Sequence, residues 1–317
     1  MTRAPRVAQR AERLLGAAVV ATAEVAGGDT CRATKLRLSD GTTALMKTAP
    51  RVPDGFFEAE ATGLRWLGSA PGDAAPVPDV LAVDEECLVV RWVEPARPSP
   101  EAATAFGRAL APTHLAGAEA FGAERDGFIG RLPLPQRTAP TWAEFYAVRR
   151  VLPYLKLARD RGALEDHQAA RIESLVGRLP GLLPEEPPAR LHGDLWNGNV
   201  VWGAGSPGEP AQGWLVDPAA YGGHREVDLA MLALFGLPHL PQVLEAYESV
   251  HPLAEGWQDR LALHQLFPLL VHACLFGGGY GPRAADLAAR SLGARAPRPD
   301  PMTPRALSAT AQPCLAQ

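Results

Sequence analysis

The sequence predicts a two-lobed α+β fold, in which an N-terminal lobe built on an antiparallel sheet precedes a larger, mainly helical C-terminal lobe. Three observations carry this prediction. Short strand patterns fill the first lobe, and an Asp40-Gly41 turn between residues 32–38 and 43–47 indicates a hairpin. A proline-rich break follows at 95–100. Beyond it, apolar residues recur at the three- and four-residue spacing of helices.

We place the lobes at residues 1–94 and 95–285. In the first lobe we expect a helix at 5–16, strands at 19–25, 32–38 and 43–47, a helix at 57–67, and strands at 80–83 and 87–93. In the second we expect helices at 101–115, 142–160, 164–179, 226–235, 241–250 and 256–276, with kinks or early ends at Pro153 and Pro268. Residues 286–317, rich in proline and alanine, are predicted to be a disordered tail.

The composition excludes several classes of partner. The 317-residue chain has a net charge of −4, so no basic footprint for nucleic acid is expected. Four scattered cysteines without a CxxC pair indicate a reducing, cytoplasmic setting. The arginine-rich start imitates a secretory leader, but Glu12 interrupts it, and no run approaches the roughly 18 apolar residues of a membrane span. We expect a soluble protein that binds a small molecule.

Polar residues with chemical potential concentrate between residues 191 and 231. Asp194 and Asn199 lie five positions apart in a stretch broken by glycines, and Asp217 follows the apolar run 214–216. Each aspartate alone could be a turn residue. Together they match the phosphoryl-transfer pattern of kinases, in which the first aspartate accepts the proton of the attacking hydroxyl, and the asparagine and second aspartate hold Mg²⁺. The sequence therefore predicts Asp194 as the catalytic group and Asn199 and Asp217 as magnesium ligands.

The first lobe offers a matching site for the phosphates of ATP. Gly27 and Gly28 lie between two predicted strands, where backbone N–H groups can face a phosphate, although strand-end glycines are mostly turn formers. Lys47 ends the third strand, the place of the phosphate-binding lysine in kinases. On the following helix, Glu60 shares the apolar face and Glu58 does not. A carboxylate on a buried face needs a partner, so we expect a Lys47–Glu60 ion pair.

The segment that joins the lobes is expected to bind adenine. Kinases hold the base there by backbone hydrogen bonds. The corresponding residues here are Arg91, Trp92, Val93 and Glu94.

Asp228 is a further candidate, because its helical face is otherwise apolar. One alternative is an exposed first-turn aspartate that is stabilised by the helix dipole. We favour a structural brace that accepts N–H groups from the 192–199 loop, with His192 and Arg225 adding to it.

The second lobe resembles a known family in three specific stretches, which are 192–199 (HGDLWNGN), 216–219 (VDPA) and 221–231 (YGGHREVDLAM). They closely resemble the fructosamine kinase, or ketosamine 3-kinase, family, a branch of the aminoglycoside-phosphotransferase-like kinases with a protein-kinase-like fold. The resemblance covers roughly residues 5–285 and includes Trp196, two residues after the aspartate. Two positions depart from it: Cys31 replaces an expected polar residue, and Gly127 replaces a common asparagine.

The resemblance implies a kinase that uses ATP and Mg²⁺ to phosphorylate a ketosamine on the hydroxyl of its third carbon. The ketosamine would be an adduct of a sugar with a small amine or with a protein lysine, and phosphorylation would make this adduct labile. We expect Trp196 to border the acceptor pocket, since indole offers a flat face for a sugar or a cation; packing under the loop is the alternative. Rival functions are an aminoglycoside, choline or homoserine kinase, and a nucleotide-binding pseudokinase module. Between residues 127 and 154 Glu144 is the only carboxylate, which favours a less cationic substrate than an aminoglycoside.

Overall fold

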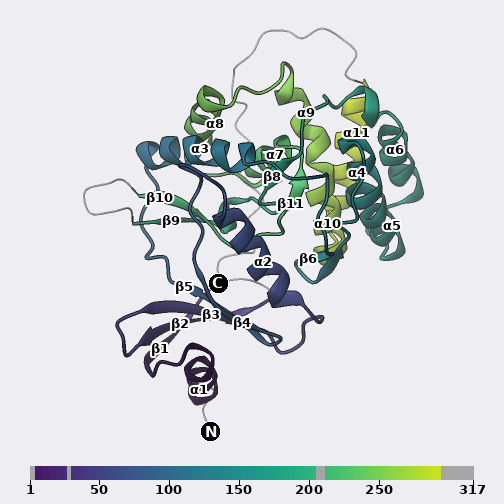
Figure 1. The fold of residues 1–317 in the computed structure, drawn as a ribbon. Helices are drawn as coiled ribbons and strands as arrows, with labels where there is room; N and C mark the ends of the chain where they lie inside the picture. The colour runs from purple at the N-terminus through teal and green to yellow at the C-terminus, as the bar shows by residue number, and fades with distance from the viewer. Residues whose placement is uncertain (1–3, 27–29, 205–210, 294–317) are drawn as a thin grey trace.

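The computed structural model describes residues 4–26, 30–204 and 211–293 of the chain, and it has the two predicted lobes (Figure 1). The smaller lobe, purple to blue in Figure 1, is a five-stranded antiparallel sheet in the order β1-β2-β3-β5-β4. Its elements are α1 (Ala4–Leu15), β1 (Val19–Val25), β2 (Arg32–Leu38), β3 (Thr43–Thr48), α2 (Phe56–Gly68), β4 (Val80–Asp84) and β5 (Cys87–Arg91). Every predicted element of this lobe is therefore present within two residues of its expected ends.

Strand alternation assigns the two faces of this sheet to the two helices. Ala44 and Met46 of β3 are buried in a cluster with Ala11 of α1. Leu45 instead packs in the cluster that Phe57 of α2 belongs to. Because successive side chains point to opposite faces, Lys47 projects from the α2 face. The alternation of side chains along β3 therefore points Lys47 towards the helix that carries Glu60.

The segment between β5 and α3 (Pro100–Leu115) is held against the larger lobe. The Ala96 N–H donates to the Trp202 carbonyl (2.6 Å), and the Ala204 N–H donates to the Glu94 carbonyl (3.1 Å). Ser99 caps α3, since its side chain accepts from the Ala102 N–H. We place the lobe boundary in this segment.

The larger lobe packs its helices around two apolar clusters. Its helical elements are α3, α4 (Trp142–Phe145), η1 (Tyr146–Val151), α5 (Leu152–Asp160), α6 (Asp166–Val176), η2 (Leu179–Gly181), η3 (Asn197–Asn199), α7 (Glu226–Phe235), α8 (Leu240–Val250), α9 (Trp257–His264), α10 (Leu266–Phe276) and α11 (Tyr280–Gly293). The α3 and α8 helices approach closely at Gly107, where an added Cβ would lie 2.2 Å from the Val243 carbonyl oxygen. Glycine is required there for the two helices to pack.

Three two-stranded ribbons, most of them not predicted, carry the loops between these helices. They pair β6 (Gly127–Ile129) with β7 (Leu132–Leu134), β8 (Ala189–Leu191) with β11 (Tyr221–Gly223), and β9 (Val200–Gly203) with β10 (Gln212–Leu215). The β8–β9 connection contains Asp194, and the β10–β11 connection contains Asp217. The two ribbons therefore hold both aspartate-bearing turns on one small framework.

The predicted helix kinks or early ends at Pro153 and Pro268 have different outcomes. Residues 142–160 form one continuous helical run, but 146–151 is a π-helical segment that ends two residues before Pro153. Proline has no N–H for the Arg149 carbonyl, which accepts from Arg150 Nη1 instead (3.2 Å). The predicted helix at 256–276 is divided at Gln265, and Pro268 lies in the first turn of α10, where its missing N–H costs little.

The predicted start of the tail at residue 286 is wrong. The α11 helix continues to Gly293, and Leu287 and Ala288 are buried in the core of the larger lobe. Alanine is the best helix former, so alanine-rich composition did not indicate disorder here. The remainder of the predicted tail, 294–317, lies outside the described residues. Among the helices that the structure describes, none has the length and apolar character needed to cross a membrane.

Candidate active site

Lys47 is buried at the centre of an ionic cluster between the lobes, in which the Asp217 side chain is 46% exposed. Its Nζ is 2.7 Å from Glu60 Oε1 and also contacts Asp217 Oδ1. The predicted Lys47–Glu60 pair is therefore confirmed. Desolvation alone would lower the pKa of Lys47, but the charges of Asp217 and Glu60 raise it, so the amine stays protonated.

The face of α2 was predicted correctly. Phe57, Ala61, Leu64 and Leu67 are its buried positions together with Gly63. Glu60 is 14% exposed, whereas Glu58 is 53% exposed and pairs only loosely with Arg65, at 3.4 Å.

Asp194 is half-buried in the loop after β8 and contacts Asn199. Asn199 Nδ2 donates to Asp194 Oδ2 (2.9 Å) and to the Asp194 carbonyl (2.7 Å). Desolvation raises the pKa of Asp194 to about 7, against the opposing effect of the Asn199 hydrogen bond. A carboxylate that titrates near neutrality can accept and release a proton at physiological pH. The Asn199 amide oxygen remains available to a cation, because the amide nitrogen makes both contacts.

His192 connects the two aspartate-bearing turns. The Asp194 N–H donates to His192 Nδ1 (3.2 Å), so the neutral imidazole carries its proton on Nε2 and donates to the Val216 carbonyl (2.8 Å). Burial lowers the pKa of His192, which keeps the ring neutral. Asp217 itself has a left-handed backbone (φ 56°), a conformation that aspartate tolerates better than most residues. This turn directs the carboxylate towards Lys47.

Asp228 is the predicted brace. Its carboxylate, fully buried on α7, accepts the His192 N–H (2.8 Å) and the Gly193 N–H (3.0 Å). His114 of α3 lies on the other side, with Nε2 3.2 Å from Asp228 Oδ2 and Nδ1 2.8 Å from the Tyr247 hydroxyl. His114 was not predicted, because a single histidine in a helix gives no local signal of a partner 114 residues away.

Arg225 does not add to this brace, and that part of the prediction is wrong. Its guanidinium binds Glu186 through Nε and Nη2 (2.8 Å each) and the His251 carbonyl through Nη1 (3.0 Å). Arg225 is drawn away from the brace by partners that lie 39 and 26 residues away in the sequence, Glu186 and His251.

Trp196 is half-buried, and its indole covers Gly198, where an added Cβ would lie 2.3 Å from the ring. On its other side it makes an edge contact with Phe235 (centroids 6.2 Å apart). His272 of α10 packs on Phe235 at 4.7 Å and touches Phe276 at 5.5 Å. An aromatic wall of Trp196, Phe235, His272 and Phe276 thus borders the loop, and only Trp196 of the four was predicted as a site residue.

Hydrogen bonds show which backbone groups of the segment between the lobes, predicted to bind adenine, already have partners within the protein. The Arg91 N–H donates to the Asp79 carbonyl (2.8 Å), and the Trp92 N–H donates to the Thr43 carbonyl (3.0 Å). The Glu94 carbonyl also has a partner, Ala204. Val93 lies after the end of β5, and within the described residues its backbone N–H and carbonyl make no hydrogen bond to another backbone group. Gly27 and Gly28 lie outside the described residues.

The cysteines behave as small hydrophobic residues. Cys31 is half-buried beside α2, and Cys87 and Cys274 are buried, all three as free thiols. Desolvation raises each thiol pKa to about 11. Cys314 lies outside the described residues.

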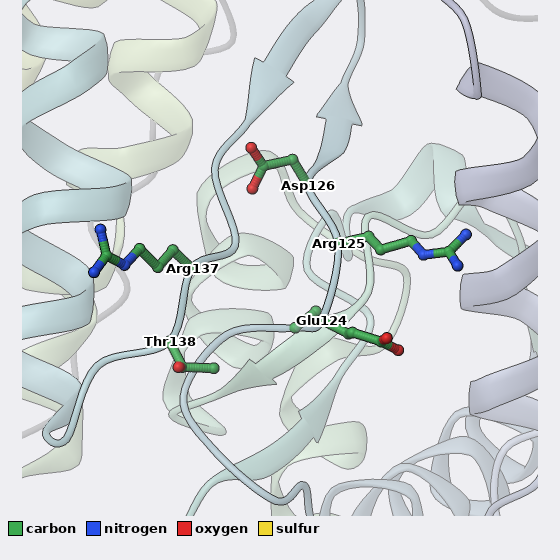
Figure 2. A pocket seen from close by; sticks show the side chains of 6 residues that line it. Glu124, Arg125, Asp126, Arg137 and Thr138 are labelled. Carbon is green, nitrogen blue, oxygen red and sulfur yellow. The ribbon is translucent and has the colours of Figure 1, made fainter.

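An open hollow lies between the chain segments on either side of the β6–β7 ribbon, and Figure 2 shows its lining. Arg125 and Arg137 project in opposite directions there. Asp126 already accepts the Gln136 N–H through Oδ1 (2.7 Å). Because its charged groups do not converge, this hollow does not compete with the Lys47–Asp194–Asp217 cluster as a reaction site.

Comparison with known proteins gives consistent matches. The family model described as fructosamine kinase matches residues 4–293. A protein of Thermus thermophilus named "probable ketoamine kinase" is 38% identical over 237 residues, covering 74% of this chain and 82% of the relative. A protein of Enterococcus faecium with the same type of name is 33% identical over 269 residues, covering 83% and 92%.

Solved structures agree. A candidate fructosamine-3-kinase from Thermobifida fusca superimposes with a TM-score of 0.85 and 49% identity, over 91% of this chain and 99% of that chain. The aminoglycoside phosphotransferase APH(4)-Ia, solved with AMP-PNP and hygromycin B, is 17% identical, with a TM-score of 0.59 over 92% and 99% of the chains, and shows the fold alone. The predicted protein-kinase-like fold is thereby confirmed.

Proposed function

The chain belongs to the fructosamine kinase family, and from this membership we propose that it transfers the γ-phosphoryl group of ATP to O3 of a ketosamine. The observation that supports this most directly is the convergence of Lys47, Asp194 and Asp217 between the lobes. The product would be a ketosamine 3-phosphate, whose amine adduct is labile, so the proposed role is deglycation of a small amine or of a glycated protein lysine.

Nucleotide binding is assigned to the smaller lobe. Lys47, oriented by Glu60, would hold the α- and β-phosphates. Gly27 and Gly28 would contribute backbone N–H groups, and Val93 would bind adenine through its backbone, because the neighbouring Arg91 and Trp92 N–H groups already have partners.

A double-mutant cycle tests the lysine–glutamate assignment. Lys47→Met and Glu60→Gln should each lower ATP affinity or kcat, and the double variant should lose less than the sum of the two, since removing either partner leaves the other unpaired. Glu58→Gln is the matched control on the same helix, because Glu58 is exposed. The measurement is kcat and KM for ATP in all variants. Additive losses for Lys47 with Glu60, or coupling of Lys47 with Glu58, would contradict the assignment.

The residues fit a magnesium ion. Asp217 offers carboxylate oxygens, Asn199 an amide oxygen, and Mg²⁺ prefers such hard ligands with only one or two carboxylates. The Asp217 carboxylate already attracts a cation, since Lys47 Nζ contacts it. Bound there, Mg²⁺ would neutralise charge on the phosphate oxygens.

Asp194 is assigned the proton transfer. Its carboxylate would accept the proton of the acceptor hydroxyl as that oxygen bonds to the γ-phosphorus, and ADP leaves with the electrons of the broken P–O bond. The Asn199 hydrogen bonds and the Asp228 brace fix its position in the loop. The pKa of about 7 leaves the carboxylate able to take this proton at neutral pH.

The acceptor is proposed to lie against the aromatic wall. Trp196 is two residues from Asp194, and its ring is partly exposed. Indole and phenyl faces suit a sugar chain and a protonated secondary amine. Aminoglycosides carry several ammonium groups and would call for many carboxylates, whereas this wall contains none.

Substrate profiling tests the proposal. The purified protein, ATP and Mg²⁺ should release ADP with synthetic fructosyl-lysine or ribulosyl-lysine, and phosphorus NMR should place the phosphate on the third carbon. Kanamycin, choline and homoserine are the comparison acceptors. Faster turnover of one of these acceptors would show that the ketosamine assignment is wrong, while the assignment as a kinase would stand. ATP binding without transfer to any acceptor would instead support the nucleotide-binding module.

Trp196→Ala is expected to raise KM for a ketosamine at least several-fold and to leave KM for ATP nearly unchanged, because the indole would contact the acceptor and not the nucleotide. Tyr280→Ala is a useful comparison, since Tyr280 touches His272 at 5.1 Å but lies one ring further from the loop. An equal rise in both KM values for Trp196→Ala would mean that the ring only supports the loop.

A further inference from the structure

Arg190 joins the two lobes at a position that the proposed mechanism does not use. It lies on β8, four residues before Asp194. Its Nη1 donates to the Trp66 carbonyl (2.6 Å) and to Ser69 Oγ (3.0 Å), at the C-terminal end of α2. Its guanidinium carbon lies 4.8 Å from the centroid of the Trp66 ring. The Trp66 carbonyl also accepts from the Ser69 N–H (3.2 Å) and the Ser69 hydroxyl (2.8 Å), so Arg190 adds a charged donor to the capped helix end and stacks on the helix's own tryptophan.

The positive charge of Arg190 is stabilised by carbonyl and hydroxyl groups rather than by a carboxylate. In the part of the chain that the structure describes, no Asp or Glu lies within ion-pair distance of its guanidinium. Partial burial lowers its pKa, in keeping with a cation that has lost water. A cation at a helix C-terminus is favoured by the helix dipole. Arg190 Nε also donates to the Gly117 carbonyl of the larger lobe (3.4 Å), so the guanidinium bridges that lobe and the end of α2.

A second contact fixes the middle of the same helix. At Gly63 an added Cβ would lie 3.2 Å from Pro218 Cγ and 3.3 Å from Ala220 Cβ. The α2 backbone thus rests directly on the residues that follow Asp217. Gly63 is one helical turn from Glu60, and Trp66 is one turn further on. Figure 1 shows α2 between the sheet and the larger lobe.

We propose that Arg190 is a positioning residue that, through Trp66, holds α2 against the larger lobe and so keeps Glu60 on Lys47. A helix of this length moves as a rigid rod, and Glu60 lies only about 9 Å along the axis from Trp66 at 1.5 Å per residue. The Lys47–Glu60 pair is then assembled by the fold itself, with no external event needed to bring the helix in. The inference rests on the proposed role of Lys47 in nucleotide binding.

Arg190→Gln tests this positioning, because glutamine keeps polarity but cannot stack and bridge at once. We expect kcat/KM for ATP to fall about tenfold, while KM for the acceptor changes less than about twofold. Arg65→Gln is the matched control: Arg65 lies at the same end of α2, but its side chain is 51% exposed. It should keep wild-type kinetics. An unchanged kcat/KM in Arg190→Gln, even with a lowered Tm, would overturn the proposal.

The decisive measurement is the same substitution in a Glu60→Gln background. If Arg190 acts through Glu60, the second substitution should lower kcat/KM for ATP no further than about twofold, although the two side chains do not touch. A general loss of stability would give additive losses instead. Full additivity would therefore contradict the positioning role.

A readout independent of catalysis separates this proposal from the proposed function. Amide hydrogen exchange over residues 56–68 should be faster in Arg190→Gln than in Arg65→Gln if the Trp66 contact holds the helix. If wild-type protein phosphorylates no ketosamine, the proposed function fails, while faster exchange still supports the helix contact. Equal exchange in the two variants overturns the contact's role whatever the substrate.

Discussion

Replacing Asp194 by asparagine is expected to lower kcat by a factor of about 10² or more, the upper range for loss of a general base, without loss of fold or nucleotide affinity. Asparagine has nearly the same shape, and its carbonyl oxygen can still accept the Asn199 Nδ2 hydrogen bond that Asp194 Oδ2 accepts (2.9 Å). It cannot take a proton from the acceptor hydroxyl. Steady-state kcat with a ketosamine, together with ATP affinity by titration, measures both parts of this expectation.

Asn197→Ala provides the control for Asp194→Asn. Asn197 is an exposed member of the same loop, so truncating it should leave turnover near the wild-type value. Turnover of Asp194→Asn within a few-fold of wild type would show that another group accepts the proton.

Local periodicity, together with the kinase pattern, was enough to find the part of the site formed by neighbouring elements. The alternation of β3 places Lys47 opposite Met46, and the helical spacing of α2 places Glu60 with Phe57 and Leu64. Sequence analysis found Lys47 from its match to the kinase lysine at the end of the third strand and Glu60 from the helical period, so the sequence was sufficient to predict the Lys47–Glu60 pair. Asp228 was found in the same way, from its apolar helical face on α7.

Contacts between distant segments could not be predicted by these rules. Arg190 meets Trp66 across 124 residues, and His114 meets Asp228 across 114. The β8 and β11 strands are only three residues long and are held by pairing with each other. Neither strand is long enough to show the alternating pattern from which a strand is predicted. Arg225 was misplaced for the same reason: its partners, Glu186 and His251, lie 39 and 26 residues away in the sequence.

The other large effect concerns Asp217. Asp217→Ala is expected to abolish the magnesium dependence of nucleotide binding, because the phosphates would then face a site without its main bridging carboxylate. Lys47 should keep its place, since its bond to Glu60 (2.7 Å) is independent of Asp217. ATP titrations with and without Mg²⁺ measure the effect: the two binding curves, separate in the wild type, should coincide in the variant.

The backbone at Asp217 requires a second variant. Its φ of 56° is a left-handed conformation that alanine adopts with strain of order 1–2 kcal/mol, whereas glycine adopts it freely. Asp217→Gly removes the carboxylate without that strain, so it should lose magnesium dependence to the same extent and unfold at a higher temperature than Asp217→Ala. Asp79→Ala removes an exposed carboxylate of the smaller lobe and should keep the wild-type response. If Asp217→Gly kept its magnesium dependence, the loss in Asp217→Ala would be due to the backbone, and Asp217 would not be the metal ligand.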